Sequence, residues 1–243
     1  MKTAQIFILF FVAIVIIGCN NDDNSIAIPT SDIIGNISLF DDEMTEVINS
    51  GMIVTIEETT PPITTLTDID GNYLLENVPF GIYTLRFEKE GFGTHKVFEI
   101  DHENRGDFTL IPNELKLGQI SNSLITETSV VLNGNFIILT VRRSDTENLL
   151  VKRMRVFYHT SDDVSSTNYT SFSPVIGTTA NPASLTFSVA FFTSLGFESG
   201  STVWFRVYGD NFYSNMYEDP NLGRSVFPNV NPNTVDAVSI ILP

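Results

Sequence analysis

Short runs in which apolar and polar residues alternate recur from residue 33 to the C-terminus, and they constrain the fold more than any other feature. No long segment places its apolar residues at the three- and four-residue spacing of a helix. Alternation with a period of two is typical of strands that bury one face. The sequence therefore predicts an all-β protein, organised as two consecutive immunoglobulin-like β-sandwiches.

The first sandwich is predicted for residues 32–113. Runs such as ISLF at 37–40, MIVTI at 52–56 and YTLRF at 83–87 are separated by turns rich in Gly, Pro and Asp. About seven strands fit this stretch, which suits a small sandwich. We expect Asp70-Gly71 to close a hairpin, because Gly accepts the positive φ of such a turn. Tyr73 and Tyr83 are expected to pack inward.

Three motifs in this stretch stand in a familiar order: TDIDGNY at 67–73, VPFGIYTL at 78–85 and EGF at 90–92. Together they resemble the carboxypeptidase regulatory-like (transthyretin-like) domain over about 75 residues. The resemblance implies a non-catalytic folding or docking module that is attached to something else.

The spacing of Asp68, Asp70 and Asn72 also imitates the first three ligands of a calcium loop. An EF-hand-type loop needs Gly at its sixth position and Glu at its twelfth, whereas this sequence has Tyr73 and Pro79 there. A structural turn is therefore favoured over a metal site, and no metal and no cofactor are expected.

The alternating pattern restarts in residues 114–243. The string VWFRVYGDN at 203–211 resembles the sixth strand of fibronectin type III-like domains, and LGFESGS at 195–201 precedes it where that family has a corner with Pro. This sequence lacks the Pro, and Val203 replaces the usual Tyr. The resemblance, over about residues 117–217, implies a second sandwich. The apolar run at 238–242 is expected to be its last strand, and residues 113–116 are expected to form a hinge between the two sandwiches.

The N-terminus predicts a secretory signal in residues 1–18. Lys2 precedes an apolar run at 6–17 that is too short to span a bilayer stably. The run ends in IIGC at 16–19, which resembles the lipobox of bacterial lipoproteins and implies lipid attachment to Cys19, the chain's single cysteine. Residues 19–31 would form a flexible tether, and its NNDDN segment resembles the tethers of Bacteroidetes-type surface lipoproteins. The alternative is an uncleaved membrane helix.

Charge excludes one class of partner and separates the two halves. The chain has 29 acidic and 13 basic residues, a balance that argues against binding nucleic acid. Residues 20–113 carry 18 acidic and 4 basic residues, whereas residues 114–243 carry 11 and 8. The first sandwich is thus interpreted as a soluble, repulsive stalk.

Residues suited to catalysis are scarce and scattered. His95 and His102 lie near Asp101 and Glu103, and His159 ends a predicted strand alone, but no metalloprotease or nucleophile motif frames them. We expect each His to be an ordinary surface or turn residue. Neighbouring acids such as Glu57 and Glu58 would point to opposite faces of a strand, so they cannot act as a glycosidase pair. The chain is predicted not to be an enzyme.

One predicted surface remains as a binding candidate. Alternation turns Val203, Phe205 and Val207 toward the core and places a set of basic and aromatic residues on the opposite face. If the two strands are neighbours, this set forms one outer patch: Arg153, Arg155, Trp204, Arg206 and Tyr208. It would be either a platform for a sugar ring or an anionic chain, or a cross-strand ladder that stabilises the sheet.

The sequence as a whole therefore predicts a non-catalytic lipoprotein of the outer membrane, exposed at the cell surface. Its partners would be the membrane, through the lipid anchor, and a glycan, a peptide or another envelope protein. The alternative is an accessory subunit or a hydrolase whose site forms only in the folded chain.

Overall fold

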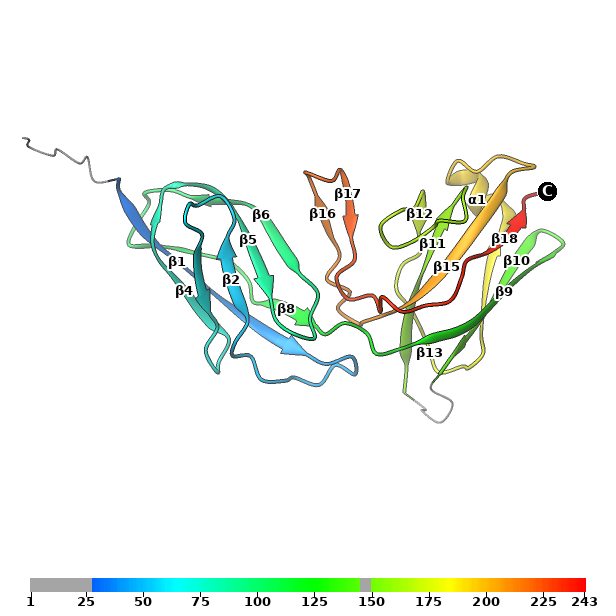
Figure 1. The fold of residues 1–243 in the computed structure, drawn as a ribbon, viewed down its shortest axis with the longest axis horizontal. Coiled ribbons are helices and arrows are strands. Elements are labelled where there is room, and N and C mark those ends of the chain that lie inside the picture. Colours follow the sequence, from blue (N-terminus) through cyan, green and yellow to red (C-terminus); the bar gives the residue numbers. More distant parts are fainter. Residues whose placement is uncertain (1–27, 145–149) are drawn as a thin grey trace, which may run out of the picture.

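The computed structural model describes residues 28–144 and 150–243, and these form two consecutive β-sandwiches (Figure 1). The predicted all-β fold is confirmed. The described residues contain a single helix, α1 (Val189–Ser194). No helix among these residues is long and apolar enough to cross a membrane. The predicted signal, Cys19 and most of the tether lie outside the described residues.

The first sandwich packs two four-stranded sheets face to face. One sheet contains β4 (Asn72–Pro79), β1 (Thr30–Phe40), β7 (Phe108–Leu110) and β8 (Leu115–Gly118). The other contains β3 (Ile63–Leu66), β2 (Ile53–Ile56), β5 (Gly81–Glu88) and β6 (His95–His102).

Alternation along β1 explains the core of the first sandwich. Ile33, Ile37 and Leu39 point inward and are completely buried, together with side chains from both sheets. Tyr73 and Tyr83 also pack inward, as predicted. Gly35 stands between the inward residues of β1, and the Tyr73 ring fills the space that a side chain at this position would occupy.

The Asp70-Gly71 turn does not close a hairpin, contrary to the prediction. The turn joins β3 to β4, and these strands belong to different sheets. It therefore carries the chain across the sandwich, and β4 pairs with β1 in antiparallel fashion. Gly71 has a φ of +81°, and its carbonyl accepts a hydrogen bond from the Ile37 amide at 3.0 Å. The positive φ agrees with the predicted turn, whereas the strand that follows the turn joins the other sheet.

Strand β8 continues the first sandwich past residue 113, where the sequence predicts its end. Residues 115–118 pair with residues 37–40 of β1 in parallel, and Leu117 is buried in the first core. Leu115 and Lys116, which fall in the predicted hinge, are consequently part of a sheet. The segment that leaves the first sandwich starts after Gly118.

The second sandwich packs a three-stranded sheet against a five-stranded one. The smaller sheet has the order β14 (Ala183–Ser188), β10 (Phe136–Arg143) and β9 (Ile125–Asn133). The larger sheet contains β12 (Ser171–Phe172), β13 (Ile176–Thr178), β11 (Lys152–His159), β15 (Thr202–Asp210) and β18 (Val238–Ile241). Val203, Phe205 and Val207 of β15 face the core between the sheets, as predicted.

A third apolar cluster covers the other face of the larger sheet. Phe157 of β11 and Tyr208 of β15 are buried there under side chains from the loops that follow β11 and β17 (Arg224–Val226). Phe227 lies across the Phe157 ring with centroids 4.8 Å apart in an edge-to-face arrangement. This part of the outer face of the larger sheet is thus covered by the third apolar cluster and is not an open surface.

A hairpin formed by β16 (Tyr217–Asp219) and β17 stands between the two sandwiches (Figure 1). On the side of the first sandwich, Tyr217 packs against His95 and Phe98 of β6, with centroid distances of 5.3 and 6.0 Å. On the other side, Tyr169 donates its hydroxyl hydrogen bond to the Ser225 carbonyl at 2.9 Å. The hairpin consequently braces one sandwich against the other.

Asparagine side chains hold the segment that joins the sandwiches. Asn215 accepts a hydrogen bond from the Gly118 amide at 2.8 Å, and Asn211 donates to the Gln119 carbonyl at 3.0 Å. From the first sandwich, Asp42 accepts a hydrogen bond from the Asn122 amide at 3.1 Å. Because both sandwiches bind this segment, the connection is a structured junction and not the predicted hinge.

Candidate functional site

The predicted outer patch does assemble on one face. Antiparallel pairing of β11 with β15 sets Arg155 opposite Tyr208 and His159 opposite Trp204. The strand neighbourhood that the sequence analysis assumed is therefore correct.

The expected exposure of this patch is wrong for Arg155 and Tyr208. Their relative exposures are 3 % and 5 %, because the third apolar cluster covers them. The Arg155 guanidinium forms an ion pair with Asp210 at 2.8 Å and donates to the Ser173 carbonyl at 2.9 Å. It also lies over the Phe227 ring, 4.9 Å from the centroid. All of these contacts serve the packing of this layer.

The other three residues of the patch are half-buried and have separate partners. Arg153 lies over the exposed Phe212 ring at 4.7 Å, and Trp204 packs against the third apolar cluster. Arg206 lies 3.9 Å from the exposed Asp236 carboxylate. The five residues thus have separate partners outside the set, and they do not form one platform.

Two of the three histidines are buried, contrary to the expectation of surface residues. His102 is fully buried, with Nδ1 2.7 Å from the Thr109 hydroxyl and Nε2 3.1 Å from the Val78 carbonyl. His95 lies at the junction, with Nδ1 3.1 Å from the Asn215 carbonyl, and burial lowers its pKa. Each ring is held by neighbouring main-chain or hydroxyl groups, in positions that stabilise the fold.

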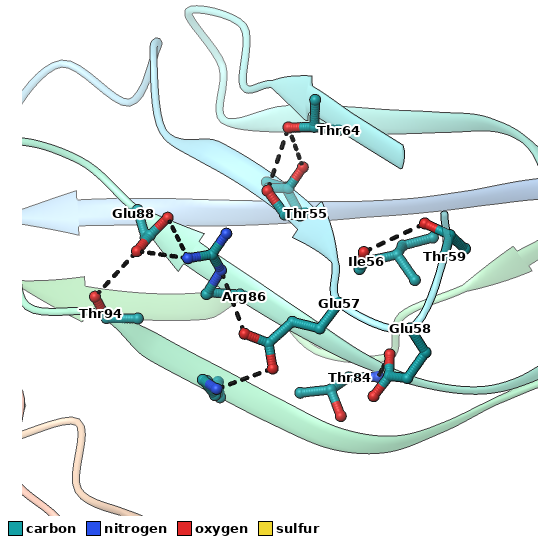
Figure 2. A network of polar contacts seen from close by, with 12 residues as sticks. Thr55, Ile56, Glu57, Glu58, Thr59, Thr64, Thr84, Arg86, Glu88 and Thr94 are labelled. Carbon is teal, nitrogen blue, oxygen red and sulfur yellow. Dashed lines mark hydrogen bonds and ion pairs between the residues drawn. The ribbon is translucent and has the colours of Figure 1, made fainter. Parts of the chain in front are cut away.

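The acidic side chains of the first sandwich bind to the protein itself. Glu57 pairs with Arg86 at 3.3 Å and with Lys96 at 2.9 Å. Its neighbour Glu58 turns the other way and accepts a hydrogen bond from the Thr84 amide at 2.8 Å (Figure 2). The two carboxylates do not pair as a glycosidase couple, but the predicted reason is wrong, because both residues lie in the turn after β2 and not on a strand.

The turn that resembles a calcium loop uses its carboxylate internally. Asp68 accepts hydrogen bonds from the Asn72 amide at 2.8 Å and from the Asp70 amide at 2.9 Å. The hydrogen bond from the Asn72 amide is the main reason why the pKa of the Asp68 carboxyl lies below its usual value. Within residues 28–144 and 150–243, no three His, Cys, Asp or Glu side chains gather in a way that could hold a metal ion.

An open trough of about 710 Å³ lies on the outer face of the β4–β1–β7 sheet, and the sequence analysis did not anticipate it. Its floor is formed by outward side chains of β1 and β4, including Ile34, Asn36 and Leu74. Leu66 at the end of β3 lines it on one side, and the other side is lined by Leu110, Ile111, Asn113 and Glu114. The volume lies within the range of small-molecule sites in proteins.

Strand register arranges the floor of the trough in two rows. Ile34 pairs with Leu74 on one neighbouring strand and with Leu110 on the other, which gives an aliphatic row across three strands. Two residues further along β1, Asn36 pairs with Asn72, and the two side chains are hydrogen-bonded at 2.9 Å. Leu74 and Leu110 are 42 % and 60 % exposed, so this aliphatic surface is open to solvent.

The sequence does contain a signal for this surface. Strand β1 carries Ile33 next to Ile34, and β4 carries Leu74 next to Leu75. Adjacent residues of a strand point to opposite faces, so each pair puts one aliphatic side chain in the core and one outside. What the sequence lacks is the pairing that places Ile34, Leu74 and Leu110 side by side.

No family model matches this chain, and no curated protein matches it. Among solved structures, a candidate carbohydrate-binding protein from Bacteroides uniformis aligns with 19 % identity and a TM-score of 0.32, over 88 % of this chain and 100 % of that one. A DUF3823 family protein from Bacteroides ovatus aligns with 14 % identity and a TM-score of 0.32, with the same coverages. A DUF3823 family protein from Parabacteroides merdae aligns with 12 % identity and a TM-score of 0.29, over 88 % and 99 % of the two chains.

Proposed function

We propose that this chain is a non-catalytic binding module of the bacterial cell envelope, and that the trough of the first sandwich is its binding site. The observation that supports this most is the open aliphatic row of Ile34, Leu74 and Leu110 beside an asparagine row. Aliphatic surface combined with a few fixed polar groups is the usual composition of a binding site. The braced junction suits a module that presents its site in a constant orientation.

In this proposal, the predicted lipid anchor determines where in the cell the protein acts. Lipidated Cys19 would hold the protein to the outer membrane, facing outward. Strand β1 begins at Thr30, at the end of the first sandwich that lies away from the second (Figure 1). The sandwich that carries the trough would therefore be the one next to the membrane.

A binding screen of the 20–243 fragment, against glycan and peptide arrays, tests the proposed function. Leu74→Ser should weaken the hits about fivefold to tenfold, because it removes apolar contact from the centre of the trough. Leu132→Ser is a matched control, since Leu132 is 40 % exposed on the second sandwich, against 42 % for Leu74. Absence of any hit, or equal loss in both variants, would contradict the proposal.

Replacing Cys19 by alanine tests the anchor. The lipid chains would be attached to the Cys19 sulfur, and the substitution should move the protein from the membrane fraction to the soluble fraction. Immunoblotting of fractionated cells measures the distribution. A variant that stays with the membranes would show that something other than Cys19 retains the chain.

A further inference from the structure

We infer that the trough binds a neutral oligosaccharide, an assignment that rests on the proposed function and specifies its ligand. Four properties of the described residues of the trough support this inference. They are the charge of the lining groups, the hydrogen-bonding atoms that these groups present, the shape of the aliphatic row, and the hydrogen bonding of the β1 main chain.

The carboxylates that line the trough already accept hydrogen bonds from other groups of the protein. The Asp68 carboxylate accepts the Asn72 and Asp70 amides, and its other oxygen lies 3.3 Å from the Asn72 side-chain nitrogen. Glu114 accepts a hydrogen bond from the Ser38 hydroxyl and lies 3.9 Å from the Lys116 ammonium. Among the residues that the structure describes, no Lys or Arg lines the trough. An anionic ligand would consequently meet only carboxylates, and a cationic ligand would compete with existing partners.

The asparagines present groups that suit hydroxyls. Asn36 uses its amide nitrogen to donate to the Asp70 carbonyl and to the Asn72 side chain, both at 2.9 Å, so its side-chain oxygen is the atom that can accept from a ligand. Asn113 lines the other side of the trough and supplies both a donor and an acceptor. A sugar hydroxyl both donates and accepts, so it can bond to either residue without a net charge.

The aliphatic row matches the apolar face of a sugar ring. Ile34, Leu74 and Leu110 lie on adjacent strands, which are spaced about 4.8 Å apart, so the row is about 10 Å long. C–H groups of a pyranose can lie on this row while the hydroxyls at the ring edge reach the asparagines. The volume of about 710 Å³ exceeds the need of a single ring, which favours an oligosaccharide.

The main chain of β1, at the centre of the floor, is closed to an added peptide strand. Strand β1 is hydrogen-bonded to β4 on one side and to β7 and β8 on the other. Its amides and carbonyls are therefore committed to the sheet, and an extended peptide cannot pair with β1 as a further strand. Recognition in the floor falls to side chains.

Titration calorimetry of the 20–243 fragment with hexasaccharide probes tests the inference. The neutral probes are cello-, malto- and xylo-hexaose, and the anionic probe is a galacturonic acid hexamer. We expect binding of at least one neutral probe and none of the anionic one. Asn113→Gly should weaken the neutral hit about fivefold to tenfold, because it removes the amide while glycine accepts the φ of 71° at this position.

The control for this variant is Asn77→Gly. Asn77 also has a positive φ, 55°, lies on β4 of the same sandwich, and does not line the trough. Binding that survives Asn113→Gly and Leu74→Ser would overturn the inference, as would preference for the anionic hexamer. If the arrays show only peptides, and Leu74→Ser abolishes those hits, the proposed function stands while the glycan assignment fails. If no glycan and no peptide probe binds, both the proposed function and the oligosaccharide assignment are overturned.

Discussion

Replacing Arg155 by alanine should lower the free energy of unfolding by about 3–5 kcal/mol, because it leaves the Asp210 carboxylate buried without its partner. The two side chains are 4 % and 1 % exposed and lie 2.8 Å apart. The guanidinium also holds the Ser173 carbonyl and supports the Phe227 ring, so alanine removes packing as well as charge. Urea denaturation followed by intrinsic fluorescence measures the change.

Two further variants distinguish the effect of breaking the buried ion pair from the effect of removing any arginine of this sheet. Arg206→Ala removes a half-buried arginine of the neighbouring strand, whose 3.9 Å contact with the exposed Asp236 is weak, and should cost about 1 kcal/mol or less. In the double variant Arg155→Met with Asp210→Leu, no buried charge is left alone, so it should be more stable than Arg155→Ala. A cost for Arg155→Ala no larger than that for Arg206→Ala would contradict a structural role for the ion pair.

The second large effect is expected at the junction, for Gly93→Ala. A Cβ at this position would overlap the main-chain carbonyl of Pro228, and backbone atoms cannot turn aside as a flexible side chain can. We expect a loss of about 2–3 kcal/mol, because overpacking a fixed contact forces the backbone to move. We expect calorimetry to show one unfolding transition for the parent protein and a broadened or split transition for the variant, because the two sandwiches would then unfold separately.

Gly106→Ala is the matched control for this variant. Gly106 also lies in the first sandwich, but a Cβ there meets no atom within 4 Å. Its effect should stay within about 0.5 kcal/mol. If Gly93→Ala has the same melting temperature as Gly106→Ala, and its small-angle scattering profile equals that of the parent protein, the junction does not depend on this close approach.

Local alternation was sufficient to predict the orientation of side chains on individual strands. Val203, Phe205 and Val207 face the core, and Trp204, Arg206 and Tyr208 face the other way, because the period of two is a property of each strand by itself. The sequence could not show that this second face is covered. Phe227 and Val230, which help cover it, come from a turn-rich stretch without alternation, and their position depends on long-range packing.

The candidate site illustrates the same limit. Ile34 and Leu74 can each be recognised as outward-facing, since each has an inward-facing aliphatic neighbour in the chain. Their meeting depends on β4 crossing to the other sheet at Gly71, and the sequence analysis expected a hairpin there. The hinge predicted at residues 113–116 is wrong for a related reason. Residues 115–118 form β8 only because the folded chain brings them next to β1, which lies far away in the sequence.

The parallel pairing of β8 with β1 also determines how the molecule bears tension. Both strands run toward the junction, so a pull between the chain before Thr30 and the second sandwich draws β1 one way and β8 the other. The hydrogen bonds between residues 37–40 and 115–118 then resist the pull together, in shear, and do not open one after another as in an unzipping hairpin. A load applied between the N-terminal end of the first sandwich and the second sandwich would thus be carried by the β1–β8 pair in shear.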